Sequence, residues 1–180
     1  MTTYHRETAY RVFAQELRNT TIVLDRDETE KFAVQYVVTE TGAKINRVFV
    51  VGTITDIEDI GQDAPYWRVR INDPTGTYVL YAGEYQPEAS RALATAEIPQ
   101  TLAVVGKAHV YMPEDGSTSV SIRPETVAVV DQPAYERWIF QTASQTLDRI
   151  RMLETQSPDA IGDMKPYREM IRNALGGGSE

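Results

Sequence analysis

The feature that most constrains the fold is a change of periodicity between residues 43 and 131, where short runs of β-branched residues alternate with turn residues. Runs of this kind predict strands that bury one face. An alanine-rich segment, Pro87–Ala96, follows the third run and starts with a proline that suits the first turn of a helix. The candidate strands are residues 45–57, 66–71, 77–83, 101–111 and 117–123, with an extension at 126–130.

Three strands, one helix and two further strands are the order of the OB-fold, a five-stranded, partly open barrel that binds oligonucleotides. Gly52 lies inside the first strand, where a small barrel has to bend. The segment Asn72–Gly76 is a strong turn signal between the second and third strands. We therefore predict a mainly β protein with flanking helices, in which residues 44–131 form a five-stranded OB-fold barrel.

Before the barrel, residues 1–43 are predicted to contain an N-terminal helix and a linker. Apolar residues recur at helical spacing within Tyr4–Leu17, and Asn19 and Thr20 end that pattern. Asp25–Lys31 is charged and typical of a loop. The helix has two interpretations at this point, packing on the barrel or docking a partner.

After the barrel, residues 132–175 are predicted to form C-terminal helices, and residues 176–180 a glycine-rich tail. A second helix is expected over Pro158–Leu175. If the first helix were only half covered, its apolar stripe would be a large exposed patch, which predicts a partner interface. The alternative is that the second helix folds back antiparallel, as a helical hairpin, and buries the stripe within the chain. The stripe comprises Tyr135, Trp138, Ile139, Ala143, Leu147, Ile150 and Leu153.

Composition excludes several kinds of site. The chain has no cysteine and two histidines, His5 and His109, so we expect no zinc site, no other metal and no cofactor. No phosphate-binding loop, dinucleotide turn or hydrolase motif is present, and we expect no catalytic residues and no enzyme activity. No apolar run is long enough to span a membrane. The net charge of −8 argues against tight, non-specific DNA binding by this chain alone.

Strand alternation nevertheless gathers basic and aromatic side chains on the predicted outer face of the barrel. The outward-facing strand positions hold five of the seven basic residues between residues 44 and 131. Acids such as Asp56, Glu58 and Asp73 are expected in loops instead. Aromatic rings that stack on bases beside cations that pair with phosphates are typical of OB-fold contacts with single strands. The third strand leaves open whether Tyr78 or Tyr81 faces outward. The predicted nucleic-acid-binding residues are Phe49, Tyr66, Arg68, Arg70, Lys107 and Tyr111.

Several segments of the chain resemble the archaeal replication-protein-A-associated family. They are Gly42–Gly52, Trp67–Arg70 with Asp73–Thr77, Tyr81–Glu88 and Tyr10–Ala14, within a match that spans Arg6 to Leu153. Members of this family look like the OB-containing middle subunit of eukaryotic replication protein A. One departure is that residues 155–180 are too few for the winged-helix domain that ends the eukaryotic subunit.

The resemblance implies a non-catalytic subunit that handles single-stranded DNA in replication, repair or recombination. It implies a hetero-oligomer with the replication protein A large subunit, joined through the C-terminal helix, and a cytoplasmic, nucleoid-associated location. Two alternatives stay open at this stage. One is a pure assembly subunit that never touches DNA, and the other is an RNA-binding OB module.

Overall fold

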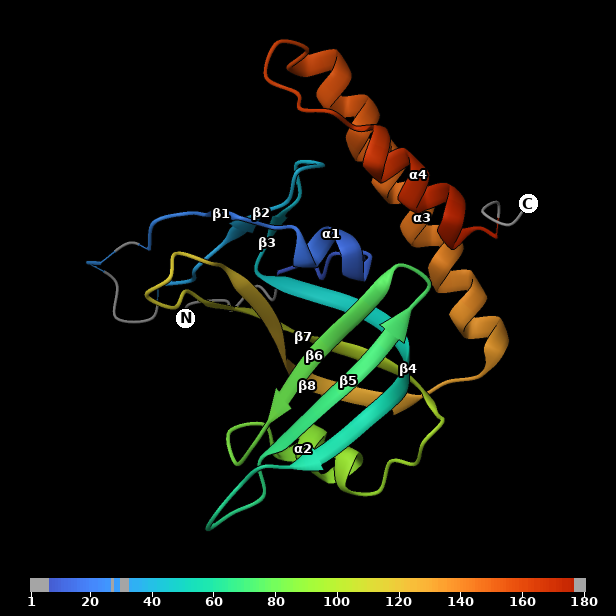
Figure 1. Ribbon diagram of the computed structural model, residues 1–180. Helices are drawn as coiled ribbons and strands as arrows, with labels where there is room; N and C mark the ends of the chain where they lie inside the picture. The colour runs from blue at the N-terminus through green and yellow to red at the C-terminus, as the bar shows by residue number, and fades with distance from the viewer. Residues whose placement is uncertain (1–6, 27, 30–32, 177–180) are drawn as a thin grey trace, which may run out of the picture.

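A closed five-stranded barrel forms the centre of the protein in a computed structural model that describes residues 7–26, 28–29 and 33–176 (Figure 1). The strands lie in the order β4-β5-β6-β8-β7, and β4 pairs with β7 to close the ring. This confirms the predicted OB-type, mainly β fold with flanking helices. The barrel strands are β4 (Arg47–Asp59), β5 (Trp67–Asp73), β6 (Gly76–Ala82), β7 (Thr101–Tyr111) and β8 (Ser119–Val129).

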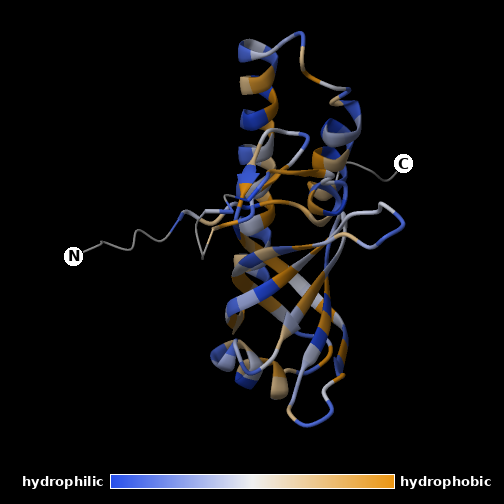
Figure 2. Ribbon diagram, turned by 90° about the vertical axis from the view of Figure 1, so that its left-hand side faces the viewer, coloured by the Kyte–Doolittle hydropathy of each residue, from blue (hydrophilic) through white to orange (hydrophobic). Residues whose placement is uncertain are grey.

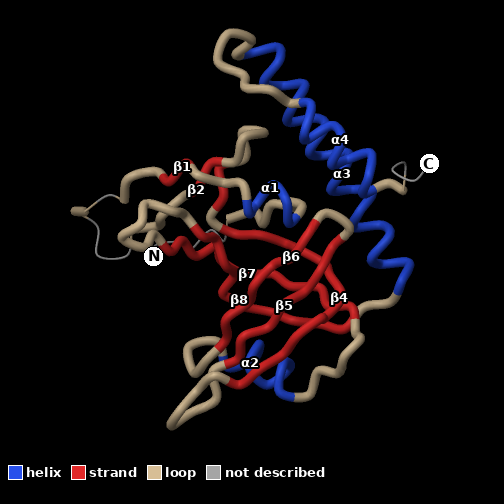
Figure 3. Tube along the Cα trace, viewed as in Figure 1, coloured by secondary structure: helices blue, strands red, loops and turns tan. Residues whose placement is uncertain are grey.

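One contact in the ring differs from the rest. Neighbouring strands pair antiparallel over many residues, but β6 and β8 are parallel and share a single partnered pair, Leu80 with Ile122. Two short helices lie at the ends of the barrel (Figure 3). Helix α2 (Pro87–Ala94) contacts β5, β6 and β8 at one end, and α1 (Ala14–Arg18) contacts β6 and β8 at the other.

The barrel interior follows from the alternation of side chains along each strand, visible as alternating colours in Figure 2. The inward residues are almost fully buried, among them Val50, Ile71, Leu80, Val104 and Ile122. Two glycines permit close approach of neighbouring backbones. A Cβ on Gly52 would lie 2.8 Å from the carbonyl oxygen of Asn72, and a Cβ on Gly106 2.5 Å from that of Arg123. The register of β4 with β5 shifts two residues after Gly52, between Ile54 and Asp56, and that of β7 with β8 shifts at Gly106, between Val105 and Gly106.

The N-terminal segment differs from the predicted helix over Tyr4–Leu17. Helix α1 covers only Ala14–Arg18, while Tyr4–Arg6 lie outside the described residues. The residues before α1 are extended, because sheet hydrogen bonds replace helical ones: the N–H of Tyr10 donates to Arg47 O (2.9 Å), and that of Phe49 donates to Tyr10 O (2.8 Å). A small sheet of three two-residue strands, β1 (Ile22–Val23), β2 (Val37–Val38) and β3 (Lys44–Ile45), follows and was not predicted.

Asp73, which we expected in a solvated loop, is instead buried at the end of β5. Its carboxylate accepts the N–H of Ala14 at 2.8 Å and that of Thr75 at 2.7 Å. The hydroxyl of Tyr78 lies 2.7 Å from the same carboxylate and 2.6 Å from Val12 O. Burial raises the pKa of Asp73, and these hydrogen bonds oppose the rise. One carboxylate thus joins the β5–β6 turn to the start of α1.

The C-terminal helices are α3 (Gln132–Gln156) and α4 (Lys165–Ala174), and α4 packs back along α3 (Figure 1). Helix α4 begins later than the predicted Pro158, because residues 157–160 form turns. The expectation that the α3 stripe is a large exposed patch is corrected. Trp138, Ala143 and Ile150 are buried within the chain, and Tyr135, Ile139, Leu147 and Leu153 are partly buried. The stripe therefore belongs to the chain's own core, but not only through a helical hairpin: Trp138 contacts Phe13 and the carbonyl oxygen of Phe49, and Leu153 lies beside Gly42.

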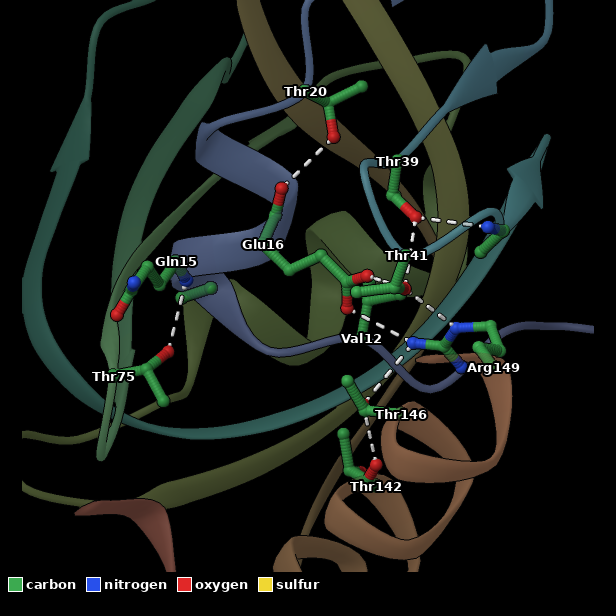
Figure 4. A network of polar contacts seen from close by, with 12 residues as sticks. Val12, Gln15, Glu16, Thr20, Thr39, Thr41, Thr75, Thr142, Thr146 and Arg149 are labelled. Atoms are coloured by element: carbon green, nitrogen blue, oxygen red, sulfur yellow. Dashed lines mark hydrogen bonds and ion pairs between the residues drawn. The ribbon is translucent and has the colours of Figure 1, made fainter. Parts of the chain in front are cut away.

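A buried ion pair holds α3 against α1 (Figure 4). Arg149 Nη2 lies 3.0 Å from Glu16 Oε2, and the Glu16 side chain is fully buried. The hydroxyl of Thr41 accepts from Arg149 Nε at 3.0 Å and donates to the other Glu16 oxygen. Because every member has a partner, the charge of Glu16 is compensated where water cannot reach it.

The covered stripe leads to a stability prediction. Ile150→Ala is expected to lower the free energy of unfolding by about 2–5 kcal/mol, because Ile150 is fully buried and its removal leaves a cavity. Phe140→Ala, on the exposed side of the same helix, should change it by no more than about 0.5 kcal/mol. Chemical denaturation of the isolated chain measures both. Equal, small effects would show that the α3 stripe is not part of the core.

Candidate nucleic-acid interface

A groove of about 260 Å³ lies on the outer face of the barrel, across the contact between β6 and β8. Alternation explains its lining: Tyr78 and Leu80 of β6 point into the core, so Val79 and Tyr81 point out. This settles which tyrosine of the third barrel strand faces outward. The groove is lined by Tyr66, Val79, Tyr81, His109, Tyr111, Ser119, Ser121 and Arg123.

The groove lies where the barrel wall has the fewest hydrogen bonds, beside the single pair formed by Leu80 and Ile122. A second hollow of about 350 Å³ extends from it toward α1 and shares Val79 and Ser119 with it. Arg18 and Arg70 are among the residues of this second hollow. The two together form a furrow that follows the β6–β8 contact.

Aromatic rings line the groove on both sides. The rings of Tyr66 and Tyr81 are stacked, with centroids 6.0 Å apart and planes inclined by 22°. Gly83 makes room for the Tyr66 ring, since a Cβ there would lie 2.6 Å from Tyr66 Cδ2. Tyr111, at the end of β7, is 63% exposed. These rings offer flat surfaces of the kind on which nucleic-acid bases stack.

The β4–β5 loop that carries Tyr66 is closed by Asp59. The Asp59 carboxylate accepts the N–H of Gly61 and that of Tyr66, each at 3.0 Å. These two backbone hydrogen bonds, that of Tyr66 first, lower the pKa of Asp59 below its ordinary value. The loop therefore presents Tyr66 at a defined position at one end of the groove.

The arginines of β5 are ion-paired. Arg70 Nη1 lies 2.8 Å from Asp56 Oδ2, and Arg68 pairs with Glu58. Both acids were expected in a loop, and this is corrected: β4 continues to Asp59 and places Asp56 and Glu58 directly opposite Arg70 and Arg68. A carboxylate tolerates this strand position because the arginine facing it compensates its charge.

The cations of β7 and β8 have a different environment. Lys107 and Arg123 lie directly opposite each other, both are exposed, and neither has a carboxylate partner among the described residues. Arg123 Nη2 lies 3.1 Å from Nε2 of His109. Partial burial, and secondarily the charge of Arg123, lower the pKa of His109.

The structure brings together only part of the predicted set. Tyr66 and Tyr111 line the groove, Arg68 and Arg70 lie on the adjacent strand, and Lys107 faces Arg123.

Phe49 lies elsewhere. The guanidinium of Arg11 lies 4.9 Å from the centroid of the Phe49 ring. The carbonyl oxygen of Phe49 accepts the indole N–H of Trp138 at 3.0 Å. Phe49 therefore packs beneath the N-terminal segment and α3.

The predicted set did not include six of the eight residues that line the groove: Val79, Tyr81, His109, Ser119, Ser121 and Arg123. Strand alternation had already placed the last four outward, but they were not counted as site residues. The signal for Tyr81 was its phase, because Tyr78 shares the inward phase with Leu80 and Ala82.

Within residues 7–26, 28–29 and 33–176, no group of three His, Cys, Asp or Glu side chains is arranged to hold a metal ion. None of the helices in those ranges combines the length and the apolar character that a membrane span requires.

Fold and groove together define an OB-fold module with an aromatic and cationic outer furrow. No family model matches the chain, and no curated protein matches it either. Several solved structures are similar to the chain in fold. A chain of the S. pombe Stn1–Ten1 complex is similar with a TM-score of 0.60 at 11% identity, covering 81% of this chain and 96% of that one.

A chain from a replication protein A heterotrimer bound to single-stranded DNA is similar with a TM-score of 0.53 at 12% identity, covering 79% of this chain and 98% of that one. At these identities the two likenesses show the fold alone. They extend beyond the barrel, since the barrel from Arg47 to Val129 is a smaller share of the chain than either match covers.

The His109–Arg123 contact leads to a prediction about pH. Because the pKa of His109 is lowered, its ring is neutral at neutral pH and gains a proton only on acidification. That proton adds positive charge beside Arg123, so affinity for a single-stranded oligonucleotide should rise as the pH falls below the ordinary histidine pKa of about 6.5. The free protein should lose stability over the same range, since the unfolded chain binds the proton more tightly.

Fluorescence anisotropy and thermal unfolding between about pH 7.5 and 5.5 test this prediction. His109→Gln should flatten both pH dependences. An unchanged pH dependence in the variant would show that another group titrates.

Proposed function

We propose that this protein is a non-catalytic subunit of an archaeal replication-protein-A-type complex, and that it binds single-stranded DNA through the furrow on its barrel. The observation that carries the proposal is the groove lined by Tyr66, Tyr81, Tyr111 and Arg123. It lies between the β4–β5 and β7–β8 loops, where OB-folds bind oligonucleotides. The proposal is supported by the similar fold of a chain from a replication protein A heterotrimer bound to single-stranded DNA.

In this proposal the bases stack on the tyrosine rings, and the cations of the outer face attract the sugar–phosphate backbone. Each stacked base contributes about 1–3 kcal/mol in OB-folds. The chain carries a net charge of −8, and Asp56 and Glu58 neutralise two of the nearby arginines. Affinity of the isolated chain is therefore expected to be modest, and the complex to supply the rest.

The proposed partner is the large subunit of that complex, and the proposed location is the cytoplasm, associated with the nucleoid. The two similar chains described above come from multi-subunit complexes, Stn1–Ten1 and a replication protein A heterotrimer. Since the predicted stripe is covered within the chain, a partner would have to meet exposed residues of α3 outside the stripe, such as Phe140, which is 67% exposed, and Met152, which is 59% exposed.

A second candidate function is assembly without DNA contact. The paired arginines Arg68 and Arg70 and the acidic net charge favour it. Crosslinking an oligonucleotide to the assembled complex and identifying the labelled subunit separates the two functions. The RNA-binding alternative predicts a preference for structured RNA over a deoxythymidine oligomer in the same assay.

The tyrosines provide the direct test. Tyr81→Ala and Tyr111→Ala should each weaken binding of a deoxythymidine oligomer by about 5- to 150-fold, the equivalent of one lost base stack. Tyr85→Ala is the matched control, because Tyr85 is 87% exposed and outside the groove. Fluorescence anisotropy on the isolated chain and on the complex gives the affinities. If all three variants bind like the parent protein, the groove is not the DNA site.

A further inference from the structure

The groove has two walls, one formed by β5 and β6 and the other by β7 and β8, and they differ in whether their cations are paired with carboxylates. On the β5–β6 wall, Arg68 and Arg70 each face a carboxylate of β4, and their positive charge is compensated in place. A phosphate approaching this wall would meet Asp56 and Glu58, which repel it. The same wall carries the stacked rings of Tyr66 and Tyr81. It is suited to bases and poorly suited to phosphates.

The β7–β8 wall has the opposite character. Lys107 and Arg123 are partners in the strand register, so their side chains leave the same face with Cβ atoms about 5 Å apart. Like charges in this position destabilise a sheet unless an anion lies between them. The nearest acid in sequence, Glu125, is occupied by Arg47, whose Nε donates to it at 3.0 Å and whose Nη2 also contacts it.

Arg123 also belongs to the groove itself, beside His109 and Ser121. A phosphate held between Arg123 and Lys107 would therefore lie at the edge of the furrow, with its nucleotide inside. Two cations with five and three N–H donors can share the oxygens of one phosphodiester. The carboxylates of the opposite wall favour this orientation by repelling the backbone from their side.

We propose that Lys107 and Arg123 form a phosphate clamp for a single-stranded nucleic acid, so that its backbone follows the β7–β8 wall and its bases turn toward Tyr66 and Tyr81. The inference rests on the proposed function and adds the orientation of the strand. It also assigns the electrostatic part of binding to this pair rather than to Arg68 and Arg70.

The salt dependence of binding tests the orientation. For the full chain with a deoxythymidine oligomer, the slope of log affinity against log salt should fall by about 0.7 for Lys107→Ala, by the same for Arg123→Ala, and by about 1.4 for both together. The control removes one ion pair without changing net charge: Glu58→Gln with Arg68→Gln should leave the slope as it is in the parent protein.

An oligomer of abasic sites adds a second readout, because it offers phosphates without bases. Lys107→Ala with Arg123→Ala should weaken binding of both oligomers, whereas Tyr81→Ala should weaken only that of the base-bearing one. A slope lowered by the Glu58/Arg68 variant and unchanged by the Lys107/Arg123 variant overturns the clamp while leaving the DNA site in the groove. If neither Tyr81→Ala nor Tyr111→Ala changes the affinity for the base-bearing oligomer, the proposed function itself is overturned.

Discussion

The interface depends on how weakly the barrel is closed between β6 and β8. A single pair, Leu80 with Ile122, joins these parallel strands, while every other neighbouring pair of barrel strands is joined by six or more partnered pairs. Because only this pair joins the two strands, the outward side chains around it border a furrow instead of a continuous sheet surface. The furrow leaves room for a ligand between Tyr81 on one strand and Arg123 on the other.

A barrel with so short a closure needs support at its ends. Asp73 provides it at one end by binding the first N–H of α1 and the hydroxyl of Tyr78, so the helix covers the barrel where β6 begins. The buried pair of Glu16 and Arg149 then fixes α1 to α3. At the other end, α2 packs on β8. The C-terminal helices thus stabilise the barrel from outside the groove and leave its face open.

Much of the fold was predictable from the sequence, because local alternation and turn residues determine the barrel strands. The strand at Thr101–Tyr111 has the predicted bounds.

The parts of the fold that could not be predicted depend on contacts between residues distant in sequence. Tyr10 and Phe13 have helical spacing, yet the backbone of Tyr10 pairs with β4. Asp56 and Glu58 look like loop residues until Arg70 and Arg68 are placed opposite them. The stripe of α3 looked exposed because the residues that cover it, including Gly42 beside Leu153, lie more than a hundred residues away in the sequence.

For the candidate site, strand alternation predicted that the cations face outward, but it could not show that β6 and β8 meet. This contact brings Tyr81 and Arg123 into the groove and leaves Phe49 outside it.

The central claim is that single-stranded DNA occupies the furrow between β6 and β8. Titration of the isotopically labelled chain with a short deoxythymidine oligomer, followed by backbone amide chemical shifts, tests it most directly. The account predicts that the largest shifts cluster in residues 77–81 and 119–123, on the two strands that border the furrow, with α3 unaffected. Shifts confined to α3 and α4, or none at saturating oligomer, would contradict it.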